Sequence, residues 1–419
     1  MKEFRFDDPD QYLSGTPYEA LAQLRATKPF AWHPASDPLK KGFWIATKHC
    51  DVVSIAKRPD IFATNSPLLG DPVPESLWEL FPSLGMIANN LMTFEHQKHL
   101  RFRTIANPIF SGPRNAMMEA ITRSICNEVL DRVSDRSQYD FAEDVALVIP
   151  VRVILGLLLG VPERDLTAVT RYVLTINAMD DPVFRPRRES LVEAAEALFD
   201  YGMTLLKRIK SSAGTDLLKE LVHISGINGV SIEEFFLAYW FPLAAGAFDT
   251  TASTIAGGVK ALLEFPEQLS LIQREPTLIP SAVEEMIRWV SPVVYFCRTA
   301  RSKVMIRENQ IKEGEKIVLC FASANRDEDV FESPDCFNVG RTPNPHLSFG
   351  YGPHFCLGAR ISSTILRIFL EEASWRLATI RPNGEVVRTR SGWMNRIRSM
   401  PVRNSEVTGA RYDSSWRRA

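Results

Sequence analysis

A lone cysteine at the start of a helix-like stretch is the feature that most limits what this chain can fold into. Residues 349–358 read Phe-Gly-Tyr-Gly-Pro-His-Phe-Cys-Leu-Gly, so two glycines and a proline form a tight loop before Cys356. A thiol there meets unpaired backbone N–H groups and the positive end of a helix dipole, and both favour the thiolate. Because no second cysteine lies nearby, the pattern indicates one bond to a metal rather than a disulfide or zinc site. The helix itself is predicted from the spacing of Leu357, Ile361, Ile365, Ile368 and Phe369.

The alternative for Cys356 is a small buried hydrophobic residue, which is the usual fate of an isolated cysteine. The surrounding pattern F-G-x-G-x-H-x-C-x-G favours the metal, because each position has a function. Phe349 can pack beside the sulfur. Gly350 and Gly352 let the backbone approach a flat cofactor, and Gly358 lets the next helix approach the same face. This string resembles the haem-binding loop of the cytochrome P450 family, in which a cysteine thiolate is the axial ligand of the haem iron.

Charge and cysteine usage exclude other classes of protein. The formal net charge of -1 argues against a nucleic-acid partner. The six cysteines form no C-x-x-C pair, which fits a reducing compartment.

The N-terminus lacks the apolar core of a signal peptide. The most apolar stretch, 145–162, is interrupted by Pro150 and Arg152 and falls short of the roughly 20 residues of a membrane-spanning helix. We therefore expect a cytoplasmic protein without a membrane anchor.

The resemblance runs from about Tyr18 to Val402 and implies the cytochrome P450 fold. That fold is mainly α (α+β), a helix-rich single domain with small β-sheets and a long central helix over the haem. We expect a catalytic domain at 1–402 and a polar tail at 403–419. Apolar and β-branched runs predict short strands, and a Pro- and Gly-rich segment without periodicity predicts a long ordered loop. The strands are 42–47, 303–307 and 316–321, and the loop is 67–90.

The predicted central helix carries an acid and a hydroxyl in an otherwise apolar sequence. Ser231 to Glu234 form a capping box, and Phe265-Pro266 should end the helix. Pro242 is expected to kink or break it. The segment 246–251, Gly-Ala-Phe-Asp-Thr-Thr, resembles the oxygen-activation motif of the family, in which a Thr hydroxyl opens the helix and donates to bound dioxygen while the neighbouring acid supplies protons.

Asp249 and Thr250 match that acid–alcohol pair, so the resemblance implies that they are the catalytic residues. Ala247 departs from the motif, because the family has a glycine there. On the residues alone, the preferred interpretation of Thr250 is a hydroxyl that bonds back to a carbonyl one turn earlier. The family members that use peroxide usually have this pair altered, so its presence favours a reductant-driven monooxygenase.

Several charged residues occupy positions that resemble family motifs. Glu285 and Arg288 form the E-x-x-R pair, and Arg341 is the third member of that structural ion cluster. Haem propionates need cationic or hydrogen-bonding partners. Four residues match family positions for that function, namely His99, Arg103, Arg298 and His346. The cofactor implied is haem b (iron protoporphyrin IX), with Cys356, Phe349, Gly350 and Ala247 also beside it.

The resemblance implies a haem-thiolate monooxygenase that inserts one atom of dioxygen into a small or medium-sized apolar substrate. A ferredoxin or similar donor would supply the electrons, and Lys98, Arg101, Arg114 and Arg360 are candidates for its basic docking patch. The alternatives are other haem-thiolate chemistry (peroxygenation, oxidative coupling, dehydration or nitration) or a non-catalytic haem-binding protein. By family analogy the substrate pocket includes Ala244, Phe248, Val294, Phe296 and Met394, with Tyr295 or Asn395 as a polar anchor.

Overall fold

One helix, α11 (Ile232–Glu264), crosses the fold, as the sequence predicts. Its first turn is capped by Ser231, whose Oγ accepts the N–H of Glu234 at 3.1 Å. The break predicted at Pro242 is wrong, because α11 continues through it without interruption. A proline cannot donate to the carbonyl one turn earlier. The carbonyl of Ala238 instead accepts the N–H of Leu91 at 3.1 Å, so it keeps a hydrogen-bond partner although the bond within the helix is missing.

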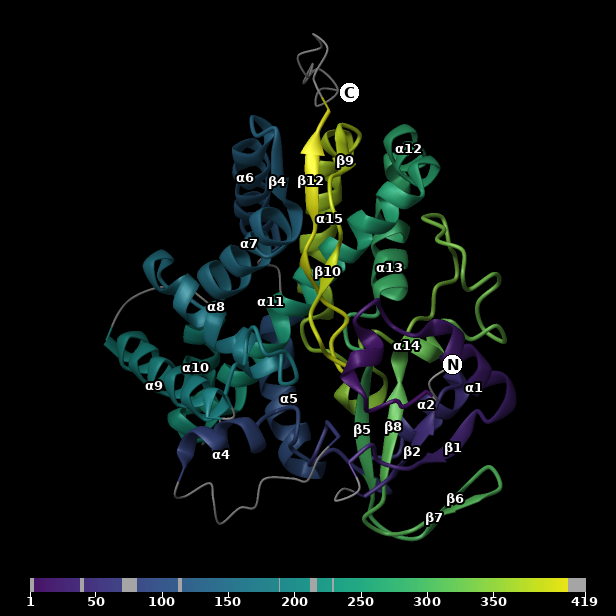
Figure 1. Ribbon diagram of the computed structural model, residues 1–419. Helices are drawn as coiled ribbons and strands as arrows, with labels where there is room; N and C mark the ends of the chain where they lie inside the picture. Colours follow the sequence, from purple (N-terminus) through teal and green to yellow (C-terminus); the bar gives the residue numbers. More distant parts are fainter. Residues whose placement is uncertain are drawn as a thin grey trace.

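The computed structural model describes residues 4–37, 41–69, 81–111, 115–187, 189–211, 217–227 and 230–405. In Figure 1, α11 lies centrally, with a group of helices on one side and the largest sheet on the other. Short π-helical segments occupy Ala142–Ala146 and Val151–Leu158. The other α-helices are α1 (Tyr18–Thr27), α2 (His49–Ala56), α4 (Pro82–Ala88), α5 (His96–Ser111), α6 (Asn115–Ser134), α7 (Val148–Pro150), α8 (Glu163–Asn177), α9 (Ser190–Ser211), α10 (Leu217–Ile227), α12 (Pro266–Arg274), α13 (Ile279–Val290), α14 (Phe321–Ala324) and α15 (Ala359–Leu377).

The strands form four small sheets. The largest has the order β1-β2-β8-β5-β3, with β2 and β8 parallel and the other neighbours antiparallel. The remaining sheets are β4-β12-β9, β10-β11 and β6-β7. The three predicted strands are confirmed as β2, β6 and β8. The strands are β1 (Phe30–His33), β2 (Phe43–Ala46), β3 (Phe62–Ala63), β4 (Gln138–Asp140), β5 (Tyr295–Ala300), β6 (Val304–Ile306), β7 (Asn309–Ile311), β8 (Lys316–Cys320), β9 (Ile380–Pro382), β10 (Val387–Arg388), β11 (Ile397–Ser399) and β12 (Pro401–Asn404).

Two predicted boundaries need correction. The segment 67–90 is not loop throughout, because α4 begins within it with Pro82 at its first position, where a missing N–H costs nothing. Residues 70–80 of that segment lie outside the described residues. The predicted start of the tail at 403 falls inside β12, which pairs with both β4 and β9. Residues 406–419 of that tail also lie outside the described part of the chain.

Small residues let α11 approach its neighbours closely. A Cβ on Gly258 would lie 2.1 Å from Cε of Met286 in α13, and a Cβ on Gly257 would lie 2.7 Å from Val290. On the other side, a Cβ on Gly202 of α9 would lie 2.4 Å from the indole nitrogen of Trp240. Within the described ranges, no single helix is long and apolar enough to cross a membrane. One pair of helices, bent by 113° at the break between them, would be long and apolar enough by length and composition alone.

A buried charge cluster joins α13 to the segment that leads to the cysteine loop, residues 349–358. Arg288 donates to both carboxylate oxygens of Glu285, at 2.7 and 2.8 Å, and neither side chain is exposed. Arg341 donates to the same carboxylate at 3.1 Å. The backbone N–H of Asn338 and the amide of Asn344 add further bonds. The predicted E-x-x-R pair and its third member therefore meet, and every oxygen of the glutamate is occupied.

Removing the carboxylate should be costly, because it leaves two guanidinium groups buried without their anion. We expect Glu285→Ala to lower the free energy of unfolding by about 3–5 kcal/mol in urea denaturation. The exposed pair of Lys260 with Glu264 gives the matched control, and Glu264→Ala should cost less than about 1 kcal/mol. Should Glu285→Ala fail to fold, Glu285→Gln tests the charge alone. Equal losses at positions 285 and 264 would contradict this account.

Candidate functional site

The cysteine loop is closed by its own backbone and opens directly into α15. The N–H of Cys356 donates to the carbonyl of Phe349 at 2.8 Å. Gly350 and Gly352 adopt φ values of 72° and 74°, which glycine tolerates best. A Cβ on Gly352 would also lie 2.6 Å from the carbonyl oxygen of Ala56 in α2. Gly358 precedes α15, so the sulfur of Cys356 lies at the predicted helix N-terminus, where its side chain is exposed.

The loop is held from behind by Asn325, a buried residue that the sequence analysis did not single out. Its Oδ1 accepts the N–H of Leu347 at 2.7 Å, and its Nδ2 donates to Ser348 Oγ at 2.8 Å. The same Nδ2 donates to Ser291 Oγ at 2.8 Å. Its backbone carbonyl accepts from Arg288 at 2.8 Å. One side chain therefore connects the buried charge cluster to the residues that immediately precede Phe349.

The pKa of the Cys356 thiol departs from the prediction. Solvent reaches the side chain, but desolvation by the protein around the sulfur still raises this pKa above its ordinary value. The N–H groups of Gly358 and Ala359 and the charge of Arg103 all lower it, as expected of a helix N-terminus, but their sum is smaller. In the protein alone the thiol is therefore favoured over the thiolate. A metal ion deprotonates a coordinating thiol by its own charge, so the site suits a sulfur that is ionised on binding iron.

A cluster of cationic and imidazole groups lies beside the loop. The rings of His99 and His354 stack at 3.9 Å between centroids. Arg103 Nη2 donates to the carbonyl of Phe355 at 2.7 Å. Burial lowers the pKa of Arg298 to about 10, and within the described residues this side chain forms no ion pair with a carboxylate. Three of the four residues predicted for the propionates, His99, Arg103 and Arg298, thus lie in one electropositive group.

The imidazoles of this cluster are neutral at physiological pH. Burial, with a contribution from Arg103, lowers the pKa of His99 to about 4. Burial together with His99, Arg298 and Arg103 lowers the pKa of His354 to about 2. The Nε2 atom of His99 is buried and has no hydrogen-bond partner among the described residues. An unpaired buried nitrogen beside two arginines fits a ligand that carries carboxylates, and together with Cys356 these groups fit haem.

The structure does not bring His346 to this cluster, which corrects the prediction. Its Nε2 lies 2.9 Å from a carboxylate oxygen of Glu284, and its Nδ1 accepts the N–H of Ser348 at 3.4 Å. Both ring nitrogens are therefore engaged elsewhere. His354, inside the motif and two residues before Cys356, occupies the place expected for His346. The sequence contained the signal, since the motif itself includes that histidine.

Thr250 belongs to a partly open face of α11. Gly246 is exposed, and a Cβ on it would meet no atom of the described residues within 4 Å. Leu243, Ala247 and Thr250 are half-buried on the same face, because residues three, four and seven apart align along a helix. The hydroxyl of Thr250 donates to the carbonyl of Gly246 at 2.9 Å, and α11 is not opened there. The back-bonding alternative for this hydroxyl is therefore what the structure shows.

The neighbouring Thr251 contacts Ser362 of α15 at 3.1 Å, which fixes α11 to the helix that follows Cys356.

Asp249 points away from this open face and is buried, with two partners that the sequence did not reveal. Asn177, at the end of α8, donates to Oδ2 at 3.1 Å. Arg396, just before β11, places its Nε 3.4 Å from Oδ1. Both partners are themselves buried. They lie far from Asp249 in the sequence, so no local pattern connects the three residues.

Most residues predicted for the substrate pocket are packed in the core. Ala244, Phe248 and Val294 have no exposed surface, because they lie on buried faces of α11 and of the segment before β5. Met394 is buried and pairs with Val293, whereas Phe296 is half-buried against Phe321 and Trp393. The polar anchors are also engaged: Asn395 bonds Val290 and Arg388, and Tyr295 is buried among aromatic rings. Of these predicted pocket residues, Phe296 and Asn395 are half-buried and the others are buried.

An open hollow of about 950 Å³ lies between α2 and the cysteine loop. It is lined by His49, Cys50, Val53, Ser54, Lys57, Arg58, Pro345, His346, Leu347, Gly350, Tyr351, Gly352 and Phe355. None of these is acidic, so the hollow is basic and apolar. The predicted basic patch is less favourable than this hollow as a docking site for an acidic electron donor. Lys98 of that patch pairs with Glu234 at 3.2 Å, and Arg114 lies outside the described residues.

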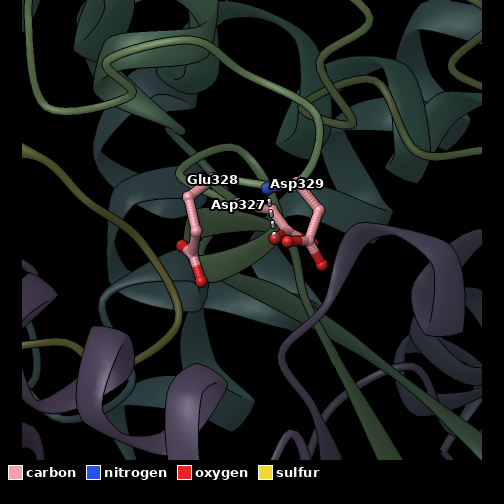
Figure 2. Close-up of side chains that lie close together, drawn as sticks. All are labelled: Asp327, Glu328 and Asp329. Atoms are coloured by element: carbon pink, nitrogen blue, oxygen red, sulfur yellow. Dashed lines mark hydrogen bonds between the residues drawn. The ribbon is translucent and has the colours of Figure 1, made fainter.

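Three acidic side chains, Asp327, Glu328 and Asp329, gather on the turn after α14 (Figure 2). Their cation is an ammonium group of the chain itself. Lys48 Nζ lies 2.8, 3.1 and 2.8 Å from the three carboxylates. Burial lowers the pKa of Lys48, but the hydrogen bonds to these acids outweigh it and raise the pKa above the usual value. The cluster therefore serves to hold the start of α2 to this turn.

Comparison with known proteins agrees with this geometry. The family model for cytochrome P450 matches residues 86–373. Cytochrome P450-terp of a Pseudomonas species is 32% identical over 92% of this chain and 93% of that protein. A steroid C26-monooxygenase of Mycolicibacterium smegmatis is 30% identical over 97% of this chain and 94% of that protein. A cytochrome P450 of Mycobacterium marinum, solved in complex with pseudoionone, has a TM-score of 0.84 and 28% identity, covering 96% of this chain and 100% of that one.

The two histidines before the cysteine, His346 and His354, provide a test of which one contacts the haem propionates. We expect His354→Ala to release haem about tenfold faster to an excess of apomyoglobin, because one hydrogen bond to a charged group is lost. His346→Ala removes a similar side chain a few residues away and should leave the rate within about twofold. The reverse order of rates would restore His346 as the ligand.

Proposed function

Because this chain belongs to the cytochrome P450 family and is a haem-thiolate monooxygenase, we propose that its substrate is a small or medium-sized apolar organic compound. The observation that carries this proposal is the open face of α11. That face presents the alkyl side chains of Leu243 and Ala247, the bare backbone of Gly246 and one hydroxyl, of Thr250. A surface with so few polar groups favours a largely hydrocarbon ligand.

The relatives support the same class of compound. One is named for oxidation of a steroid at C26, and another was solved with pseudoionone. Both compounds are mostly hydrocarbon with few oxygen atoms. Ala247 adds a methyl group where the family usually has glycine, which narrows the space beside Thr250. We therefore propose a substrate that places a slender alkyl or alkenyl carbon against this part of α11.

We propose that Cys356 holds the haem iron, and that His99, Arg103, Arg298 and His354 hold the propionates. When bound, haem with a thiolate ligand activates dioxygen for insertion of one oxygen atom into the substrate. The chain supplies the surroundings of that reaction. The closed cysteine loop keeps the sulfur at the N-terminus of α15, and the bond between Thr251 and Ser362 holds α11 beside it.

Asp249 and Thr250 are proposed to deliver the protons that the reaction consumes. The Thr250 hydroxyl lies on the open face, and its one proton is donated to the carbonyl of Gly246. Its oxygen can accept a further hydrogen bond, and it can pass its proton on once the bond to Gly246 is released. Asp249 faces the protein interior on the adjacent side of α11. This intact acid–alcohol pair favours a reductant-driven reaction over one driven by peroxide.

We propose that the electron donor is a small acidic ferredoxin that docks in the hollow between α2 and the cysteine loop. The lining contains Lys57 and Arg58 and no acidic residue, which suits an acidic partner. Tyr351 and Phe355 are exposed large hydrophobic residues at the same place, and such residues often anchor an interface. Phe355 directly precedes Cys356, so a partner seated here would lie beside the iron ligand.

The proposed substrate class is tested by optical titration. We expect pseudoionone, or a steroid with a C26 carbon, to displace iron-bound water and to shift the haem band to the blue. Gly246→Val should weaken that binding by about tenfold or more, because the new side chain fills the open face. The thermal midpoint serves as the control and should stay unchanged, since a Cβ at this position meets no neighbour. Unaltered affinity would place the substrate elsewhere.

Reversal of one charge in the hollow tests the docking site. We expect Lys57→Glu to raise the KM for an acidic ferredoxin several-fold at low salt, with the difference shrinking as salt screens the interaction. Arg187→Glu is the matched control, because Arg187 is an exposed arginine in the connection between α8 and α9, away from α2. Equal effects of the two variants would reject this face.

A further inference from the structure

Thr64 is a buried residue, directly after β3, that contacts the imidazole of His354. Its Oγ1 lies 3.3 Å from Nε2 of that histidine, although the two residues are 290 positions apart in the sequence. The contact joins the segment after β3 to the cysteine loop, on the side where the cationic and imidazole cluster lies. The sequence analysis did not single out this threonine, because only the fold brings it to His354.

The backbone of Thr64 is fixed by an acid at the start of α5. Its N–H donates to Oε1 of Glu95 at 2.8 Å, and Oε2 of the same carboxylate lies 2.5 Å from Nη2 of Arg301. The carbonyl of Glu95 accepts the N–H of His99 at 3.2 Å, so this residue also holds the first turn of α5. The hydroxyl of Thr64 is therefore held at a defined place beside the imidazole.

The imidazole of His354 is itself held in place. Its ring stacks on that of His99, with 3.9 Å between the centroids and 29° between the planes. Its Nε2 contacts Thr64, whereas its Nδ1 forms no hydrogen bond with any described residue. Nδ1 is therefore the nitrogen that remains for a ligand from outside the chain.

The hydroxyl proton of Thr64 has two acceptors within reach. Nε2 of His354 is 3.3 Å away, and the carbonyl of Phe94 is 3.5 Å away. Because its pKa is low, the ring of His354 is uncharged and carries one proton. If the hydroxyl donates to Nε2, the ring proton lies on Nδ1. If the hydroxyl donates to Phe94, the ring proton lies on Nε2 and Nδ1 presents only a lone pair.

We propose that Thr64 is a positioning residue for haem binding, whose hydroxyl donates to Nε2 of His354 and so keeps the ring proton on Nδ1. The proposal rests on the proposed contact of His354 with the propionates. A carboxylate accepts hydrogen bonds only, so it is bound by the Nδ1–H tautomer and repelled by the lone pair of the other. Thr64 acts on the propionate only through the imidazole, and its contribution to haem binding should vanish when the imidazole is removed.

Exchange of haem with an excess of apomyoglobin tests the proposal. We expect Thr64→Val to release haem about fivefold faster than the unaltered protein, because the hydrogen bond from Nδ1 to a charged group is weakened. Thr64→Ser keeps the hydroxyl and should recover most of the loss. Thr47→Val is the matched control, since Thr47 is a buried threonine directly after β2 whose hydroxyl donates to the carbonyl of Pro29 at 2.9 Å. Its rate of haem release should equal that of the unaltered protein.

The same exchange in a His354→Ala background separates positioning from a general structural defect. With the imidazole removed, Thr64→Val should cause no further acceleration, because both substitutions remove the same interaction. Equal acceleration by Thr64→Val in the presence and in the absence of the imidazole would overturn the proposal. An unchanged rate of haem release in Thr64→Val alone would overturn it too.

A second readout reports the tautomer directly. Nitrogen NMR of histidine-labelled protein, in the diamagnetic carbon monoxide complex of the reduced haem, distinguishes Nδ1–H from Nε2–H, and His354→Ala identifies the signals. We expect Nδ1–H in the unaltered protein and in Thr64→Ser, and Nε2–H or a mixture in Thr64→Val. Nε2–H in the unaltered protein, or Nδ1–H unchanged in Thr64→Val, would contradict the proposal. If His354→Ala alone left haem release unchanged, the proposed propionate contact would fail, and the tautomer would still decide the interaction of Thr64 with His354.

Discussion

The position of the cysteine sulfur depends on one buried glutamate that two arginines share. Glu285 accepts hydrogen bonds from both Arg288 and Arg341, and Arg288 also donates to the carbonyl of Asn325. The side chain of Asn325 then fixes the backbone at Leu347 and Ser348, directly ahead of the cysteine loop. Because each group in this series is buried and bonded, the loop cannot relax without leaving a charge or an amide unpaired.

Local sequence was sufficient wherever the physical cause is local. The cap at Ser231, the glycines of the cysteine loop and the i, i+3 pair of Glu285 with Arg288 could all be predicted, since each depends on neighbours within a few residues. The direction of the pKa shift at Cys356 could not be predicted, because burial of the sulfur in the folded chain raises the pKa by more than the local amides lower it. The contacts of Asn177 and Arg396 with Asp249 could not be predicted for the same reason, because only the fold brings these residues together.

Two errors could have been avoided with the sequence alone. The motif around Cys356 contains His354, whereas the prediction names the earlier His346, whose Nε2 lies beside a carboxylate oxygen of Glu284 in the structure. The pocket residues predicted on α11, Ala244 and Phe248, lie on a different face of the helix from Thr250. Residues four apart share a face, so Ala244 and Phe248 lie together in the core, whereas Gly246 and Thr250 share the accessible face.

The hydrogen bonds of Asn325 also limit which substitutions this chain can accept at position 325. Its amide uses its oxygen as an acceptor and its nitrogen as a donor to two serine hydroxyls. An aspartate has nearly the same shape but would replace the donor with a second acceptor and add a charge in an enclosed place. The isosteric exchange at this position, including the one that spontaneous deamidation produces, would therefore disrupt the haem site more than many larger changes at the surface.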